Sequence, residues 1–423
     1  DMLDGRTAGS GGGNHLTLGG PTALSSPFVN RGDILASLLT FIQHHPSLSY
    51  MFNGLFVGPT SQAPRVDEAR HDSLYELELA LERGFADARP WAPWENDRLY
   101  RNLLTDLTGN THRAEVCVDK LYDYSTAHGR QGVVELRAFE MPPHPRMVSA
   151  QMFLMRSLIA SFARSPYSGE LVRWGSRLHD QFLLPTWMWQ DFQSVLAHLR
   201  RTADIDYPEE AFRPFLELRC PTIGRFDAGG VTVELRNAVE PWNVLGEELT
   251  STGTARYVDS SMERIEIRAE GFVDERHTLT VNGHAVPLIA TGTAGERVGG
   301  VRFRAWAPPH SLHAHLGIHH PLRIDLYDRW AGRALAAGAY HVWHPEGRAF
   351  EEAPLTRFEA SARRSQRFEQ VGPMPYEQIP DASRRAPDAP YTLDLRRIRL
   401  DRPMPPPEER EPFEAQSIAQ VGW

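Results

Sequence analysis

Lysine is almost missing from this sequence, since Lys120 is the one lysine among 45 basic residues. Arginine must therefore build most of any site that binds an anion or a phosphate. Cysteine is scarce too: Cys117 and Cys220 can supply neither a disulfide framework nor a site of four thiolates. No apolar run approaches the roughly 20 residues that cross a bilayer, and the first residues lack the pattern of a secretion signal. These absences favour a protein of the reducing cytoplasm, without a membrane partner.

An excess of positive charge is also lacking. The formal net charge of the 423 residues is −9. Because nucleic-acid binding requires clustered positive charge, we expect no nucleic-acid partner. What remains is ordinary globular composition, with 41% hydrophobic and 23% charged residues, which argues against disordered and fibrous chains. At roughly 100–200 residues per domain, the length predicts two or three domains.

The first half of the chain is expected to mix helices and strands. Several segments space their apolar residues as one face of a helix, and others alternate as a half-buried strand does. The pattern predicts helices over residues 33–43, 72–81, 96–107, 148–162 and 168–200, and strands over 113–118 and 132–139.

The character of the sequence changes near residue 205. Beyond it, short alternating runs are broken by glycine and proline, and Asn282-Gly283 between two apolar runs indicates a hairpin. One amphipathic helix is expected over 351–369. We therefore expect an α+β protein with a mixed domain over 1–205, a β-rich sandwich or open barrel over 206–370, and an extended, proline-rich tail over 371–423.

A glycine run over residues 9–13 leads into Asn14 and His15. No Gly-Lys-Ser/Thr follows, so it is not the phosphate loop of nucleotide hydrolases, and no strand of this chain precedes it as in a dinucleotide site. Two interpretations remain. The segment is either a flexible loop with a surface histidine, or a loop whose backbone approaches a ligand while His15 binds metal or substrate.

Glu135 and Arg137 stand two residues apart in the predicted strand 132–139, so their side chains share one face of it. Either the two form a surface ion pair, or Glu135 binds a cation and Arg137 holds an anion beside it. The prolines that follow end the strand and place Glu140 and His144 near its end.

Two more segments combine charge with rigidity. Residues 58–71 carry Pro59 and Pro64, which rigidify the segment, followed by Arg65 and acidic neighbours. Residues 110–115 carry Arg113, which could bind a phosphate in bidentate fashion. Solvated loops usually hold such charges. The histidines over 310–344 have spacings that metal sites use, but no carboxylate or thiolate accompanies them in a known ligand pattern, so we interpret them as structural.

Taken in order, these segments resemble the second half of the amidoligase superfamily, typified by glutamine synthetase and the glutamate–cysteine ligases. Those enzymes carry a glycine-rich turn into a strand with a metal-binding histidine, and then a helix and a loop of the form Gly-x-Glu-Ala-Pro. A strand with an arginine follows, and last comes a strand of the form hydrophobic-Glu-hydrophobic-Arg before a proline-rich turn. The matching segments are 11–15, 58–64, 110–113, 134–137 and 142–145. The resemblance covers about residues 5–160 and implies the C-terminal half of a glutamine-synthetase-like antiparallel sheet with helices.

Nearly the whole chain is also similar to the C-terminal part of a bacterial amidoligase-like domain of unknown function. That domain usually follows a transglutaminase-like domain in one polypeptide. The blocks that carry this similarity are 4–20, 58–72, 139–146 and 240–248.

The resemblance implies ATP-dependent amide formation, in which a carboxylate is phosphorylated and an amine attacks the acyl phosphate. The implied cofactors are ATP and Mg²⁺ or Mn²⁺, and the substrates are a carboxylate and an amine. By resemblance, the metal ligands are His15 and Glu135, the catalytic phosphate contacts are Arg137 and Arg113, and further nucleotide contacts come from Asn14 and Arg65.

In that superfamily, further metal-binding glutamates and part of the nucleotide site lie on strands before the glycine loop. We therefore expect those strands and a transglutaminase-like domain as partners, and negligible ligase activity of these 423 residues alone. Two other functions stay open: a non-catalytic binding or assembly module, and a metal-dependent amide hydrolase that uses His15 and Glu135. A nucleophilic hydrolase is disfavoured, because Cys117 lies in a predicted strand and no serine stands in a Gly-x-Ser-x-Gly elbow.

Overall fold

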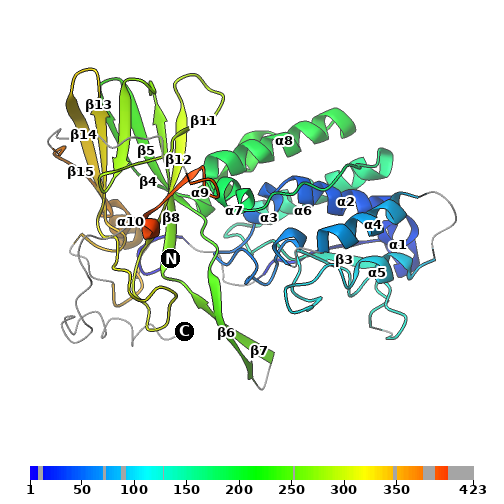
Figure 1. Ribbon diagram of the computed structural model, residues 1–423. Helices are drawn as coiled ribbons and strands as arrows, with labels where there is room; N and C mark the ends of the chain where they lie inside the picture. Colours follow the sequence, from blue (N-terminus) through cyan, green and yellow to red (C-terminus); the bar gives the residue numbers. More distant parts are fainter. Residues whose placement is uncertain are drawn as a thin grey trace. The chain divides into compact units, whose positions relative to one another are not determined.

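The chain folds into two compact units, which we call the helical unit and the sandwich unit (Figure 1). The computed structural model describes residues 1–7, 13–69, 73–86, 92–126, 128–250, 253–345, 350–374 and 386–398. The helical unit takes its residues from Gly9–Leu178 and Trp187–Arg219, and the sandwich unit from Asp1–Ala8, His179–Thr186 and Cys220–Trp423. The α+β class expected from the sequence is confirmed. The domain boundaries at residues 205 and 370 stay predictions.

The helical unit is built from helices and one small antiparallel sheet of order β1-β3-β2. Helix α2 is almost entirely buried, because its sequence is apolar on nearly every side. Asp33 in its first turn stabilises the helix, because its negative charge lies at the positive end of the helix dipole. The strands are β1 (Leu16–Gly19), β2 (Val116–Cys117) and β3 (Val133–Leu136), and the helices are α1 (Pro27–Asn30), α2 (Gly32–His44), α3 (Ser47–Tyr50), α4 (Ser73–Phe85), α5 (Glu95–Tyr100), α6 (Pro145–Arg164), α8 (Pro185–Ala203, from residue 187 in this unit) and α9 (Arg213–Arg219).

Two predicted helices are shorter than expected. The helix expected over 96–107 ends with α5 at Tyr100, because Asp106 accepts hydrogen bonds from the backbone N–H groups of Thr108 and Asn110 and so favours a turn. The helix expected over 168–200 begins only at Arg177, after an extended stretch in which Gly175 has a φ of +56°. It is also divided into two helices, α7 (Arg177–Phe182) and α8, because proline at position 185 begins a new helix. The helices predicted over 33–43 and 148–162 are confirmed, as is the one over 72–81 in its described part from residue 73.

The sandwich unit consists of two open sheets that share one hydrophobic core (Figure 1). Val233, Ile267 and Val301 from one sheet and Leu279 and Ile324 from the other belong to this core. The first sheet has the order β11-β12-β8-β5-β4, with β16 beside β12, and the second has the order β10-β9-β13-β14-β15; β6 and β7 form a separate ribbon. The strand bounds are β4 (Thr222–Ala228), β5 (Val231–Ala238), β6 (Asn243–Thr250), β7 (Gly253–Asp259), β8 (Met262–Glu270), β9 (His277–Val281), β10 (His284–Ala285), β11 (Ile289–Ala290), β12 (Arg297–Arg304), β13 (Leu322–Asp328), β14 (Arg333–Tyr340), β15 (Phe368–Val371) and β16 (Thr392–Asp394).

The sequence anticipates parts of this unit and misses others. The hairpin at Asn282-Gly283 is confirmed: both residues have positive φ, 48° and 79°, and they join β9 to β10. The helix expected over 351–369 is wrong in its bounds, because α10 covers only Arg357–Ser365 and the chain then adds β15 to the sheet. Part of the expected tail is packed, since β16 pairs with β12 in parallel. Residues 375–385 and 399–423 of that tail lie outside the described residues.

The first residues of the chain also belong to the sandwich unit. Asp4 is 1% exposed and accepts hydrogen bonds from Arg6 Nε and Arg367 Nη1 at 2.5 and 2.9 Å. Gly5 follows with a φ of +83°, and a Cβ there would lie 2.2 Å from Ala360 O, so glycine is required at this close approach. A buried ion pair thus fixes the N-terminal segment to the strands of the sandwich.

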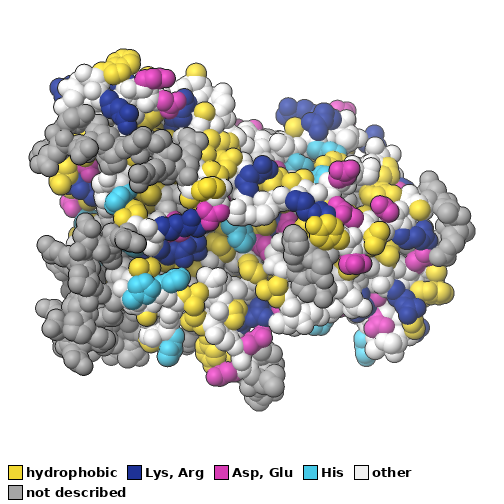
Figure 2. Space-filling view, in the orientation of Figure 1, with side chains coloured by type: hydrophobic (Ala, Val, Ile, Leu, Met, Phe, Trp, Pro, Cys, Tyr) yellow, Lys and Arg dark blue, Asp and Glu magenta, His cyan; other side chains and the backbone are white. Residues whose placement is uncertain are grey.

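Two properties concern the described residues as a whole. On the face that Figure 2 shows, basic side chains are interspersed with acidic ones. Within the described ranges, no helix combines the length and the apolar character that crossing a membrane requires.

Candidate functional site

The candidate site lies on one face of the small sheet in the helical unit. In its register, Thr17 of β1 and Cys117 of β2 both stand opposite Glu135 of β3. Residues opposite one another in antiparallel strands point to the same side, so these three side chains share a face. The other face carries Leu16, Val116 and Leu136, which stand opposite one another and are all buried. The sheet therefore has one polar and one core face.

His15 is held against Glu135 at the start of β1. His15 Nδ1 lies 2.8 Å from Glu135 Oε1. A Cβ at residue 13 would lie 2.3 Å from His15 Nε2, so the glycine there makes room for the imidazole. Asn14 donates its backbone N–H to Phe139 O (2.9 Å) and its side-chain amide to Gln151 Oε1 (3.0 Å), which fixes the chain before the strand. The rest of the predicted glycine loop, residues 9–12, lies outside the described residues.

Glu135 is the centre of the cluster. Its carboxylate accepts hydrogen bonds from Arg137 Nη1 at 3.2 Å and Lys120 Nζ at 3.3 Å. Burial by itself would raise the pKa of Glu135, but the charges of Arg137 and Lys120 and the hydrogen bond of His15 outweigh it and lower that pKa. Glu135 is therefore ionised at neutral pH. We call His15, Lys120, Glu135 and Arg137 the sheet-face cluster.

The sheet-face cluster carries a net positive charge even without the histidine, because one carboxylate faces two cations. The side chains of His15 and Lys120 are 27% and 44% exposed, so the positive charge is accessible to a ligand. Arg137 Nε is buried and has no acceptor among the described residues. Such a surface attracts anions, and phosphate oxygens are suitable acceptors for a guanidinium.

The donor set of the cluster fits part of a metal site. Glu135 offers carboxylate oxygens and His15 a ring nitrogen, and Mg²⁺ is commonly held by one or two carboxylates together with waters and substrate phosphates. Among the described residues, neither belongs to a group of three potential ligands. His15 and Glu135 would thus hold a divalent cation only together with other donors.

Other residues that the sequence analysis singled out do not belong to the sheet-face cluster. Arg113 lies in the turn before β2, at the opposite edge of the sheet from β1, where its backbone N–H donates to Asn110 O (3.1 Å). Glu140 pairs with Arg219 at 2.5 Å, and burial raises the pKa of this carboxyl group. His144 is the N-cap of α6 and accepts the N–H of Arg146 at 3.1 Å. Residues 70 and 71, at the end of the charged segment 58–71, lie outside the described residues.

Arg65 is completely buried and serves the core of the helical unit. All five guanidinium N–H groups donate: to Asp67 twice, at 2.8 and 2.9 Å, to Ser49 Oγ at 2.7 Å, and to Ile42 O and Gln43 O at 3.0 and 2.9 Å. No donor remains for a nucleotide in this arrangement. We therefore interpret Arg65 as a structural residue, apart from the sheet-face cluster.

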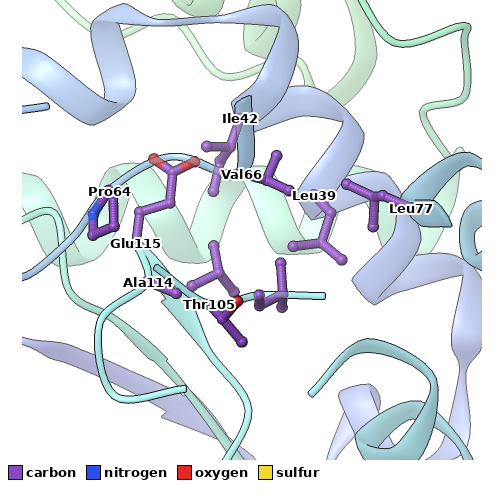
Figure 3. A pocket seen from close by; sticks show the side chains of 10 residues that line it. Leu39, Ile42, Pro64, Val66, Leu77, Thr105, Ala114 and Glu115 are labelled. Atoms are coloured by element: carbon purple, nitrogen blue, oxygen red, sulfur yellow. The ribbon is translucent and has the colours of Figure 1, made fainter. Parts of the chain in front are cut away.

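One pocket of the helical unit lies on the core side and is mostly apolar (Figure 3). Leu39, Ile42 and Leu77 line it, and Glu115 and Thr105 are the polar residues among its ten. Burial raises the pKa of Glu115 to about 7. This pocket offers no cation for a phosphate, so the polar sheet face is the better candidate for a nucleotide site.

The histidines over 310–344 belong to the sandwich unit and take part in local contacts. His319 Nδ1 accepts the backbone N–H of Arg304 at 3.0 Å, and His341 Nε2 lies 2.9 Å from Glu369 Oε1. Burial lowers the pKa of both His319 and His320. These contacts are those of residues that hold loops to strands.

Sequence reasoning did not assign a site role to four residues on or next to β2. Lys120 contacts Glu135 directly, and His112, Cys117 and Asp119 form a second group around β2. The sequence feature that could have drawn attention to Lys120 is that it is the single lysine of the chain. His112, Cys117 and Asp119 come together through the turn that leads into β2 and the residues directly after that strand.

Comparison with protein families matches residues 1–396 to the family described as "Putative amidoligase enzyme (DUF2126)". Comparison with curated proteins and with solved structures gives no match. The match extends through the sheet-face cluster and nearly the whole sandwich unit. The chain belongs to this amidoligase family.

Proposed function

We propose that this chain carries part of the site of an ATP-dependent carboxylate–amine ligase. The observation that carries the proposal is the sheet-face cluster, in which a metal-binding type of pair, His15 and Glu135, lies beside the cations Arg137 and Lys120. Membership in the amidoligase family supports the reaction class. A glutamine-synthetase-like arrangement of the sheet remains part of the proposal.

The proposed reaction has two steps. A substrate carboxylate attacks the γ-phosphorus of ATP and ADP leaves; an amine then attacks the acyl phosphate, the amide bond forms and phosphate leaves. Bound Mg²⁺ or Mn²⁺ supplies charge neutralisation at the phosphates. Arg137 and Arg113 would contact the transferred phosphoryl group, and Asn14 would contact the nucleotide.

Glu135 and His15 would hold the metal ion, and Lys120 has a supporting role. Lys120 and Arg137 keep Glu135 ionised, which is the form that binds a metal. Two donors do not complete a coordination shell, so we propose that further carboxylates come from another segment or chain, with a transglutaminase-like domain as a partner. Binding of ATP, rather than turnover, is therefore the suitable readout for these 423 residues.

The test is thermal stabilisation of the full chain by ATP with and without Mg²⁺. Ligand at about 100 times its Kd stabilises a protein by about 2.7 kcal/mol, which raises Tm measurably. We expect Glu135→Gln to lose the Mg²⁺-dependent part of the shift but to keep or strengthen binding of metal-free ATP, because the cluster becomes more positive. Glu76→Gln, at an exposed position in α4, is the matched control and should behave as the parent chain.

The alternatives predict other outcomes of this measurement or of an amide-cleavage assay. An equal Mg²⁺-dependent shift in parent and Glu135→Gln would refute the metal assignment. Absence of any shift in the parent would favour a non-catalytic assembly module. Cleavage of an amide without ATP, lost in His15→Ala, would favour a metal-dependent hydrolase.

A further inference from the structure

A second group of potential metal ligands lies beside the sheet-face cluster. His112, Cys117 and Asp119 each offer one ligand atom, and these atoms lie within 4.8 Å of one another. Cys117 is in β2, Asp119 lies two residues further on, and His112 belongs to the turn before the strand. A nitrogen, a sulfur and a carboxylate oxygen thus meet at one point of the helical unit.

Neighbouring residues hold these ligands in place. Asp119 Oδ1 accepts a hydrogen bond from Arg101 Nη1 at 3.0 Å, and Asp119 Oδ2 accepts one from Thr111 Oγ1 at 2.8 Å. The backbone N–H of His112 donates to Asn110 Oδ1 at 2.9 Å, which shapes the turn. Outer hydrogen bonds of this kind orient metal ligands in known sites.

We propose that His112, Cys117 and Asp119 bind a transition-metal ion of the zinc class. Thiolate, imidazole and carboxylate are the ligands that Zn²⁺ takes in proteins, whereas Mg²⁺ takes oxygen ligands almost alone. Three protein ligands leave the fourth tetrahedral position to water or an external ligand, and the His112 side chain, 67% exposed, leaves the group open to solvent.

Binding requires small rearrangements that the site allows. His112 Nδ1 lies 2.6 Å from Asp119 Oδ2, whereas two ligands of tetrahedral Zn²⁺ stand about 3.3 Å apart when each bond is about 2.0–2.1 Å. The exposed imidazole can move by that difference. Burial raises the pKa of the Cys117 thiol to about 11, so the thiol is protonated at neutral pH without a metal. The metal ion must displace this proton, which leaves to solvent as the sulfur–metal bond forms.

The site would adjoin the sheet-face cluster without sharing its ligands. Cys117 stands directly opposite Glu135 in the register of β2 with β3, so the two side chains lie on the same face at the spacing of a cross-strand pair. A cation at Cys117 would add positive charge next to the proposed phosphate site. This inference uses different residues and does not depend on the proposed ligase activity.

The test uses Co²⁺ as a spectroscopic probe on the full chain, followed by displacement with Zn²⁺. We expect one equivalent of Co²⁺ to give the absorption of a tetrahedral ion and a thiolate-to-cobalt charge-transfer band, both removed by Zn²⁺. Loss of an outer hydrogen-bond partner typically lowers metal affinity about 10–100-fold, so Thr111→Val should lower the affinity for Co²⁺ by about tenfold. His112→Ala removes a ligand at an exposed position and should lower that affinity more than Thr111→Val does. Cys117→Ser should abolish the charge-transfer band.

Matched controls separate this site from other cysteines and histidines. Cys220→Ser removes the other thiol, and His128→Ala removes an exposed histidine of the same unit; both should bind as the parent does. Glu135→Gln and His15→Ala should keep the charge-transfer band whatever they do to ATP binding. The proposal is overturned if the parent shows no such band, or if the band survives Cys117→Ser or the affinity survives His112→Ala.

Discussion

Arg65 stabilises the helical unit by neutralising buried acids. Its guanidinium is fully buried and donates all five N–H groups, two of them to Asp67. Removing one partner of a buried pair leaves the other charge uncompensated, which typically costs about 3–5 kcal/mol. We therefore expect Arg65→Gln to lower the free energy of unfolding by that amount in urea denaturation. Arg200→Gln removes a pair whose members are 65% and 69% exposed, and should change stability by less than about 1 kcal/mol. Equal effects of the two variants would contradict the structural role of Arg65.

Glu266 should make the stability of the sandwich unit depend on pH. It is completely buried in β8 and accepts hydrogen bonds from Thr186 N and Oγ1 at 2.9 and 2.7 Å, and burial raises its pKa to about 7. Because the pKa of Glu266 is higher in the folded protein than in the unfolded chain, protonation of Glu266 stabilises the fold. This contribution to the free energy of unfolding is full below the pKa of the unfolded chain and is lost as the pH rises through 7. The free energy of unfolding of Glu266→Gln, measured relative to the parent, should therefore increase from pH 5 to pH 8 by up to about 3 kcal/mol. Urea denaturation at both pH values measures this, with Glu270→Gln, exposed on the same strand, as the control. A difference that is constant with pH would refute the shifted pKa.

At the residue scale, the sequence predicted which neighbouring side chains share a face, but it did not predict which side chains are buried. The two-residue spacing placed Glu135 and Arg137 on one face, and the 3.2 Å contact confirms it. The same reasoning could not separate Arg65 from Arg137, because the burial of Arg65 depends on tertiary contacts with α2, whose Ile42 and Gln43 accept its hydrogen bonds. Acidic residues at 67 and 68 were the local hint that Arg65 is paired. The metal and nucleotide roles stay predictions.

At the element scale, the turn between β9 and β10 depends on the conformation of Gly283. Its φ is +79°, and no atom lies within 4 Å of a Cβ built there, so a substitution tests the backbone alone. A left-handed conformation costs about 1–2 kcal/mol for a residue with a Cβ, so Gly283→Ala should destabilise the sandwich unit by that amount in urea denaturation. Gly246 in β6 has equally open surroundings without a positive φ. Gly246→Ala should be neutral or stabilise by about 0.4–1 kcal/mol, and an equal loss in both variants would contradict the argument.

Elements were predicted best where the local pattern has one interpretation. The apolar spacing of α2 and the Asn-Gly turn after β9 needed no distant partner, and both are confirmed. The helix expected over 351–369 was wrong because residues 368–371 satisfy their backbone by pairing with β14. A short segment at a sheet edge takes its structure from the strand beside it, which a local pattern does not contain.

At the scale of the whole molecule, the sequence order of the chain does not follow its compact units. Residues from Asp1–Ala8, His179–Thr186 and Cys220–Trp423 form the sandwich unit, although helical-unit residues separate these segments along the chain. The small sheet of the helical unit likewise joins residues about 120 positions apart, such as Thr17 and Glu135. Such long-range pairings are fixed by tertiary packing, so the sequence predicted the α+β class and several elements but not this partition.

The first residues of the chain should therefore stabilise strands more than 300 residues away. Asp4 compensates Arg367, which is 3% exposed and also contacts Tyr340 at the end of β14. Asp4→Asn would leave that charge buried without its partner, at a cost of about 3–5 kcal/mol. In hydrogen-exchange mass spectrometry, we expect peptides from β14 and β15 to exchange roughly a hundredfold faster or more, since each 1.4 kcal/mol is a factor of ten. Peptides from α2 serve as the internal reference, and Asp1→Asn, at an exposed position in the same segment, should leave both unchanged. Unaltered exchange of β14 in Asp4→Asn would show that the N-terminal segment rests on the sandwich without stabilising it.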